Sequence, residues 1–415
     1  MVDYNSNLLI LNIVLWVLML IWYLKKYKHF GAGGLLISAF IFYSVCSYPI
    51  FFDTEWNYFF KDLKLFPLLL HVVLIVISFI PIFKWDGMKV NEIKVHNYSF
   101  IKLVCWFFVI CTIMRVGDLT TIYSGIMEMM AGGGADVYNE TMSESLHNSG
   151  NRGISNVFSI FSNLLYGICT LFFFFLLMKK ERNKFLIWLL VISFIISILI
   201  PIAISQRGPA LNRALLFLGT YFIMKDYLPK KITKIVSVSF ITIGVLLLVP
   251  ILYITFARFE DRGALNSLCY YFGEQNIYFN NYALDNNGIR YGDRVFPMFK
   301  EILGYENVPA DFWERRFKYP HLKINDEVFI GYVGDLFLDF GPIIASLIII
   351  IYSWFCVSKL KIKNGVLYLY QLLPINILMH ICLFGGLFLF PYADTGNLEI
   401  IMYILMYLAL KYFRI

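Results

Sequence analysis

The sequence predicts an all-α, polytopic integral membrane protein: a single transmembrane domain over residues 1–415 with about 11 transmembrane helices and large extracytoplasmic loops. Two observations carry this prediction. Hydrophobic residues make up 59% of the chain and charged residues 15%, against roughly 45–50% and about 25% in soluble proteins. Eleven apolar runs are also long enough to cross a bilayer, which takes about 20 residues per helix.

The apolar runs follow one another along the whole chain. We place them at 6–24, 31–52, 65–83, 99–117, 154–178, 185–205, 209–228, 235–257, 336–358, 366–390 and 398–413. The first run lacks a basic leader and a small-residue cleavage site, so we expect a retained span and not a signal peptide.

The charges of the loops predict an orientation. One set of alternate loops holds 20 of the 35 basic residues and four of the 28 acidic residues. Cytoplasmic loops carry such an excess of Lys and Arg, so we expect the N-terminus outside and the C-terminus in the cytoplasm. The net charge of +7 then reflects topology and anionic lipid in the bilayer, and no nucleic-acid partner is expected.

Two long loops fall on the outer side, at 118–153 and 258–335. Loops of this length are usually functional. The larger one contains aromatic-rich stretches, and its segment 311–317 has the pattern of an amphipathic interfacial helix. The seven cysteines show no CxxC spacing or disulfide framework, so we expect neither a metal nor another cofactor.

A polar segment, 205–213, interrupts the apolar sequence at the outer start of the seventh span. Pro209 suits the first turn of a helix, and the N-terminus of a helix attracts anions. Arg207 and Arg213 could therefore hold a phosphate or diphosphate, which suits the planar arginine fork. The alternative is that both side chains extend to lipid headgroups or pair with an outer acid.

Four arginines of the larger outer loop are further candidates for a binding site. Arg258 and Arg262 follow the eighth span and either bind a ligand or pair with neighbouring acids. Arg290 and Arg294 flank a turn-like segment, where the choice lies between ligand contacts and ordinary loop charges.

Two aspartates precede or open the ninth span. Asp335 and Asp339 are four residues apart and would share one face of a helix. Both are candidate catalytic carboxylates: Asp335 could serve as a general base, and Asp339 could act at the same site or could instead cap a helix that begins at Pro342. His321 titrates near neutral pH and could also be a base, although a surface histidine is the simpler interpretation.

These elements together resemble the Wzy-type polymerases of bacterial polysaccharide repeat units. The likeness rests on Gln206-Arg207-Gly208, on the large late outer loop that opens with Arg258, and on segment 331–335 followed by Asp339-Phe340-Gly341. It covers roughly residues 150–358. Arg262 and Gly273 also fit an Arg-x10-Gly spacing that some members carry, whereas eleven spans depart from the more usual even count.

The resemblance implies an enzyme of the bacterial cytoplasmic membrane that joins undecaprenyl-diphosphate-linked repeat units at the outer face. An acceptor hydroxyl would displace the lipid diphosphate of the donor glycan. Arg207 and Arg258 would hold the diphosphate, Asp335 would position or deprotonate the acceptor, and Tyr332 would contact substrate. A chain-length regulator and a flippase would be its protein partners.

Three other functions are consistent with the same sequence. An O-antigen ligase shares the arrangement of spans and the large outer loop but transfers to lipid A core. A flippase for lipid-linked oligosaccharides would need cationic contacts across the bilayer, whereas the charges here gather at the outer face. A non-enzymatic scaffold of an envelope complex would leave the outer arginines without a chemical role.

Overall fold

A computed structural model describes residues 2–53, 62–115, 154–180, 182–203, 207–239, 242, 244, 264–326, 328–390 and 393–413. Within these residues the regular structure is helical apart from one small parallel sheet, in which β1 (Glu92–Lys94) pairs with β2 (Val366–Tyr368). The chain divides into two compact units, which we describe separately. Unit 1 comprises residues 1–94 and 268–401, and unit 2 comprises 95–267 and 402–415.

Seven of the described helices are long and apolar enough to cross a membrane, so the chain is a helical membrane protein. Each coincides with a predicted span. They are α1 (Val2–Tyr27), α2 (Ala32–Phe51), α3 (Leu65–Asp86), α7 (Ile154–Met178), α8 (Lys184–Ala203), α14 (Gly331–Lys359) and α16 (Ala393–Tyr412).

The other four predicted spans differ from these helices. Helix α4 (Tyr98–Ile113) and the pair formed by η6 (Leu369–Leu372) and α15 (Leu373–Phe384) are apolar but shorter. Helix α9 (Arg207–Met224) opens with a polar first turn. The run 235–257 lies mostly outside the described residues. The total of eleven spans therefore stays a prediction.

The predicted loop at 258–335 is largely folded, which corrects its description as a loop. It contains α11 (Ala264–Tyr282), α12 (Pro297–Ile302), α13 (Phe312–Lys318) and the start of α14. Helix α11 is less apolar than the membrane-spanning helices, so hydropathy alone does not reveal it, yet Ile277 and Phe279 on it are completely buried. Helix α13 matches the helix predicted at 311–317, and the loop predicted at 118–153 lies outside the described residues.

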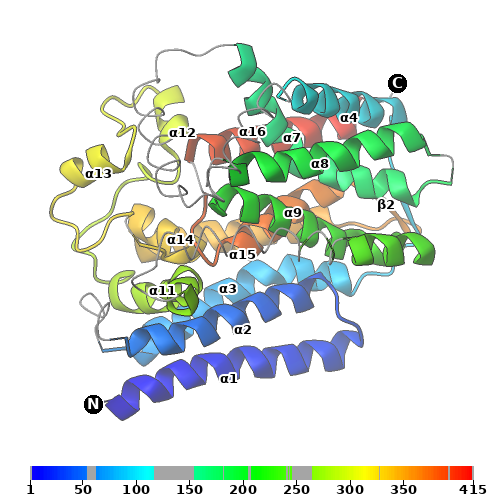
Figure 1. Cartoon of the computed structure of the whole chain (residues 1–415). Coiled ribbons are helices and arrows are strands. Elements are labelled where there is room, and N and C mark those ends of the chain that lie inside the picture. Colours follow the sequence, from blue (N-terminus) through cyan, green and yellow to red (C-terminus); the bar gives the residue numbers. More distant parts are fainter. Residues whose placement is uncertain are drawn as a thin grey trace. The chain divides into compact units, whose positions relative to one another are not determined.

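Unit 1 is built on α1, α2 and α3, with α14 packed along α3 and α15 against α2 and α3 (Figure 1). Asp86, the last residue of α3, joins three helices. Its carboxylate accepts a hydrogen bond from the hydroxyl of Tyr23 at 2.6 Å and from the backbone N–H groups of Ala32 and Gly33 at 3.2 and 2.7 Å. It therefore satisfies the free N–H groups that open α2.

Helix α11 lies very close to α2. A Cβ atom at Gly273 would come within 2.5 Å of the backbone of Cys46, so only glycine permits this approach. The hydroxyl of Ser47 donates across the contact to the carbonyl of Gly273 at 2.8 Å. This packing accounts for Gly273 without any role in a sequence motif.

Helix α14 consists of two parts that meet at Gly341, whose φ of 74° and ψ of 169° are not helical. Residues 331–339 are all buried. Beyond the break the helix exposes large apolar side chains, including Ile343 and Trp354 at 76% and 68%. The first part thus belongs to a protein core, and the second has the surface of a membrane span. Helices α12 and α13 lie at the end of unit 1 where α14 begins (Figure 1).

Unit 2 contains α4, α7, α8 and α9. Phe173, Phe194 and Phe217 come from three different helices, and their ring centroids lie 5.5–6.0 Å apart. Such aromatic contacts add stability beyond the buried area itself. Helix α9 begins at Arg207, which places Pro209 in its first turn as predicted.

Candidate functional site

Arg290 is the centre of a buried charge cluster in unit 1. Its side chain is 0% exposed. The Nε atom donates to Asp339 Oδ1 at 2.6 Å, and Nη2 lies 3.5 Å from Asp335 Oδ1. Nη1 also donates to the backbone carbonyl of Asn325 at 3.2 Å. A buried guanidinium requires such complete pairing, because an unpaired charge in a protein core is very costly.

The conformation of the loop after α11 positions Arg290 in the cluster. The loop after α11 turns through residues with positive φ, among them Asn287, Gly288 and Gly292. The backbone N–H of Arg290 then donates to the carbonyl of Leu338 at 2.8 Å, which fixes the loop against the first part of α14.

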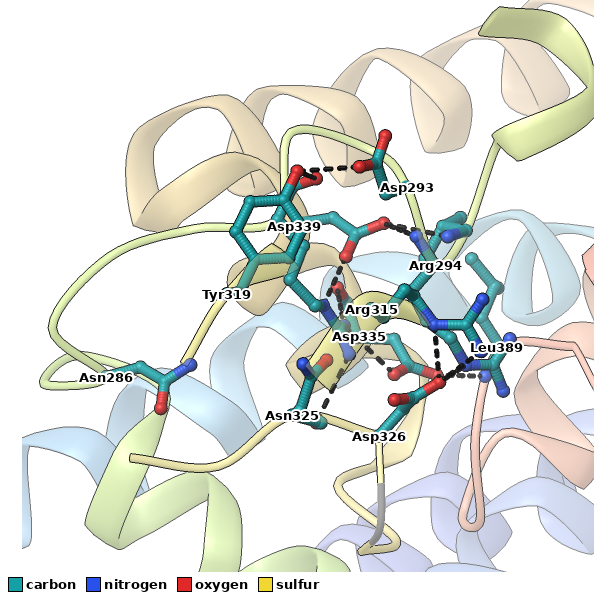
Figure 2. Close-up of polar contacts among 12 residues, drawn as sticks. Asn286, Asp293, Arg294, Arg315, Tyr319, Asn325, Asp326, Asp335, Asp339 and Leu389 are labelled. Atoms are coloured by element: carbon teal, nitrogen blue, oxygen red, sulfur yellow. Dashed lines mark hydrogen bonds and ion pairs between the residues drawn. The ribbon is translucent and has the colours of Figure 1, made fainter. Parts of the chain in front are cut away.

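Asp335 and Asp339, both labelled in Figure 2, share one face of α14, as their spacing predicts. Both carboxylates pair with Arg290. The second oxygen of Asp339 accepts from the backbone N–H groups of Arg294 and Val295 at 3.2 and 2.8 Å. The second oxygen of Asp335 accepts from the backbone N–H of Leu389 at 2.8 Å. Asp339 therefore binds the loop before α12, and the alternative that it caps a helix at Pro342 is wrong.

A third carboxylate of the cluster, that of Asp293, is surrounded by hydrogen-bond donors. Its side chain is 0% exposed; it accepts from Lys318 Nζ at 2.7 Å and from the hydroxyl of Tyr319 at 2.6 Å, and it pairs with Lys300. Burial alone would raise the pKa of Asp293, but the hydrogen bonds from Lys300, Lys318 and Tyr319 outweigh burial and lower it. These contacts hold α12 and α13 against the loop that carries Arg290.

Arg294 and Arg315 converge on Asp326 (Figure 2). Arg315 approaches Asp326 Oδ2 through Nε at 2.8 Å and Nη2 at 2.5 Å, and Arg294 approaches the same oxygen through Nε at 3.4 Å. The arginine side chains are 12% and 10% exposed, so they lie at the edge of the cluster. Arg294 also donates to the backbone carbonyl of Phe390 at 3.1 Å.

The cluster contains five cations and four carboxylates: Arg290, Arg294, Lys300, Arg315 and Lys318 with Asp293, Asp326, Asp335 and Asp339. Burial lowers the pKa of Arg290, but the carboxylates of Asp339, Asp335 and Asp326 outweigh burial and raise it. Arg290 is therefore charged at every physiological pH. It is not an ordinary loop charge, so that interpretation of the sequence is wrong for Arg290.

Other predicted residues lie elsewhere. Tyr332 is buried in unit 1, with its hydroxyl in hydrogen-bond contact with Ser78. His321 is exposed, as the simpler interpretation predicted, with its ring centroid 6.3 Å from that of Tyr319. Neither side chain contacts the Arg290 cluster through a described hydrogen bond, although the hydroxyl of Tyr319 donates to Asp293 of the cluster.

In unit 2, Arg213 points into the helical core and not toward lipid headgroups. Its Nη2 atom donates to Asn163 Oδ1 of α7 at 2.7 Å, and Nη1 donates to the carbonyl of Ser197 in α8. The side chain of Arg207, and all of Arg258 and Arg262, lie outside the described residues. Their assignment to a diphosphate stays a prediction.

Five members of the cluster were not predicted from the sequence: Asp293, Lys300, Arg315, Lys318 and Asp326. Only Arg315 had a signal in the sequence. It lies between Trp313 and Phe317, on the opposite, polar face of the helix predicted at 311–317. Among the described residues, no group of three or more His, Cys, Asp or Glu side chains is arranged to hold a metal ion.

Comparison of the chain with family models, with curated proteins and with solved structures finds no match. The functional argument therefore rests on the residues and on their geometry.

Proposed function

We propose that the protein is a glycosyltransferase that joins undecaprenyl-diphosphate-linked oligosaccharide repeat units at the outer face of a bacterial cytoplasmic membrane. One observation carries the proposal. The segment from Gly331 to Gly341, which resembles an element of the Wzy-type polymerases, holds its two aspartates on the buried Arg290 at the start of an apolar helix. Charge that is paired and buried at the end of a membrane helix is costly and is usually functional.

The proposed reaction depends on cationic side chains more than on a general acid. The leaving group is a lipid diphosphate, which is already a stable anion, so no strong general acid is needed. Its developing charge does need stabilisation by fixed donors, which is often the largest single contribution to catalysis. Arg294 and Arg315 suit this role because they lie at the edge of the cluster and the arginine fork matches phosphate oxygens.

Asp335 and Asp339 have a positioning role in this proposal. Both oxygens of each carboxylate are occupied by Arg290 or by backbone N–H groups, so neither is available to take a proton from a sugar hydroxyl. They hold Arg290, and through the loop after it they fix Arg294. This revises the prediction that Asp335 is the general base.

The orientation with the basic loops inside supports an outer-face reaction, because the whole cluster lies in the larger outer loop or in the first part of α14 that follows it. Arg207 and Arg258 stay candidate diphosphate ligands on sequence grounds. A chain-length regulator and a flippase stay expected partners, and neither metal nor cofactor is invoked.

The test is reconstitution. The purified protein in proteoliposomes is given undecaprenyl-diphosphate repeat units from its host, and the products are separated by length. A ladder of lengthened glycans is the expected result. Transfer only to added lipid A core would replace the proposal by a ligase, and lipid movement across the bilayer without new bonds would replace it by a flippase.

Arginine variants sharpen the assignment. Arg294→Ala should lower the rate of chain extension by about 10²–10³-fold, the usual loss for one oxyanion donor. Arg316→Ala is the matched control, since Arg316 is exposed on α13 next to Arg315. Equal rates for the two variants would remove Arg294 from the diphosphate site.

A further inference from the structure

A row of three aromatic rings runs from α11 to the edge of the Arg290 cluster. The ring centroids of Tyr271 and Phe329 lie 5.1 Å apart, and those of Phe329 and Phe388 lie 5.6 Å apart. All three side chains are half-buried. The guanidinium of Arg294 lies 6.0 Å from the ring centre of Phe388, so the row ends at a cation.

Glu274 lies beside the middle of this row. Within the part of the chain that the structure describes, its carboxylate accepts one hydrogen bond, from the backbone N–H of Phe329 at 3.3 Å. Among the described residues it has no cation within ion-pair distance. By contrast, Asp293, Asp326, Asp335 and Asp339 are all held by arginine or lysine. The carboxylate of Glu274 can therefore accept further hydrogen bonds, and it lies beside Phe329.

The environment of Glu274 suits proton transfer. Burial raises the pKa of Glu274 to about 7, although the N–H of Phe329 opposes that shift. A general base works best when its pKa lies near the operating pH.

The next residue on α11 adds a polar group without a partner. Gln275 is 1% exposed, and within the described part of the chain neither its Oε1 nor its Nε2 has a hydrogen-bond partner. The amide lies against Gly331, where a Cβ atom would be 2.8 Å from Oε1. A buried amide left unsatisfied is destabilising, so this position favours a hydroxyl-bearing ligand or an ordered water.

We propose that Tyr271, Phe329 and Phe388 form a saccharide-binding row and that Glu274 takes the proton of the acceptor hydroxyl. Aromatic rings pack against the C–H faces of sugars, while a carboxylate and an amide recognise their hydroxyl groups, the usual combination of an apolar surface with few polar groups. A glycan that lies along the row places its diphosphate end at Arg294. This inference rests on the proposed function, since it names the sugar-binding part of that site.

The reaction balances without any further reagent. The acceptor O–H bond breaks as its proton moves to the Glu274 carboxylate, and the oxygen forms a bond to the anomeric carbon of the donor. The bond from that carbon to the phosphate oxygen breaks, and its electron pair leaves with the undecaprenyl diphosphate. Glu274 then returns its proton to water.

Binding is tested first, with an oligosaccharide that carries no diphosphate. The probe is the free oligosaccharide released by mild acid from the lipid-linked repeat units of the host, titrated into the detergent-purified full chain. Tyr271→Ala should weaken binding about 3- to 10-fold, the contribution of one aromatic contact. Trp313→Ala is the control, because Trp313 is an exposed aromatic side chain outside the row. Equal affinities of the two variants for the oligosaccharide would refute the proposal that the aromatic row binds saccharide.

Turnover tests Glu274 separately. Glu274→Gln should keep the affinity for the free oligosaccharide but lower the rate of chain extension about 10²–10⁴-fold, and added formate should restore turnover to Glu274→Ala. If Glu274 had only a structural role, formate would not restore turnover, and that result would overturn the assignment of Glu274 as the general base. If wild-type protein binds the oligosaccharide but makes no ladder, the proposed polymerisation fails while the row stands.

Discussion

Arg290 offers the sharpest test of the buried cluster. Arg290→Met keeps a long side chain but leaves Asp335 and Asp339 buried without their cation. Breaking a buried ion pair by removing one partner costs about 3–5 kcal/mol. For a domain of 150–250 residues that cost corresponds to a loss of roughly 6–20 °C in melting temperature. Thermal unfolding of the detergent-purified protein measures it.

The same experiment contains its own control and its own refutation. Arg316→Met removes an exposed arginine and should shift the melting temperature by no more than a surface substitution does. The double variant Arg290→Met/Asp339→Asn should recover part of the loss, because it removes one uncompensated charge. If Arg290→Met and Arg316→Met have the same melting temperature, the cluster does not stabilise unit 1 and the pairing described above is wrong.

Three further predictions concern other parts of the molecule. Asp293 has a lowered pKa, so its stabilising contribution is complete above its unfolded pKa of about 3.9 and is lost as pH falls through the lower folded value; Asp293→Asn should be less stable at pH 7 and lose less on acidification. Gly341→Ala should cost about 1–3 kcal/mol through backbone strain alone, since a Cβ atom there would meet its nearest neighbour at 3.7 Å, and Gly208→Ala serves as its control. Arg213→Met should lower the melting temperature of the purified protein, because it removes partly buried hydrogen bonds to Asn163 and to the carbonyl of Ser197; unchanged stability combined with lost chain extension would instead favour a role in holding diphosphate.

The helices were predictable because the bilayer imposes them. A membrane span must bury every backbone polar group within the helix and present apolar side chains to lipid, so seven predicted spans coincide with long apolar helices. Helix α11 follows another rule. It buries one face against α2 and mixes polar with apolar residues, so a hydropathy average does not reveal it.

The site was predictable in part for a related reason. The spacing of Asp335 and Asp339 predicted a common face, and the structure confirms it. Their partner Arg290 lies 45 and 49 residues away along the chain, and no local pattern marks an arginine in a loop as buried. Asp326 and Arg315 join the cluster by tertiary contacts of the same kind. Glu274 was not predicted because it is distinguished by having no cation nearby among the described residues, a property that a sequence does not display.

The break at Gly341 has a consequence for distance. From Pro342 to Lys359 the second part of α14 is about 27 Å long at 1.5 Å per residue, close to the hydrocarbon thickness of about 30 Å. The buried charges just before the break are thus held at a set height above the hydrocarbon layer, on the same chain segment that spans it. Under the proposed function, a substrate anchored in that bilayer by its own lipid tail would meet them at that height without a search along the membrane normal. Its encounter with the cluster would then reduce to diffusion in two dimensions.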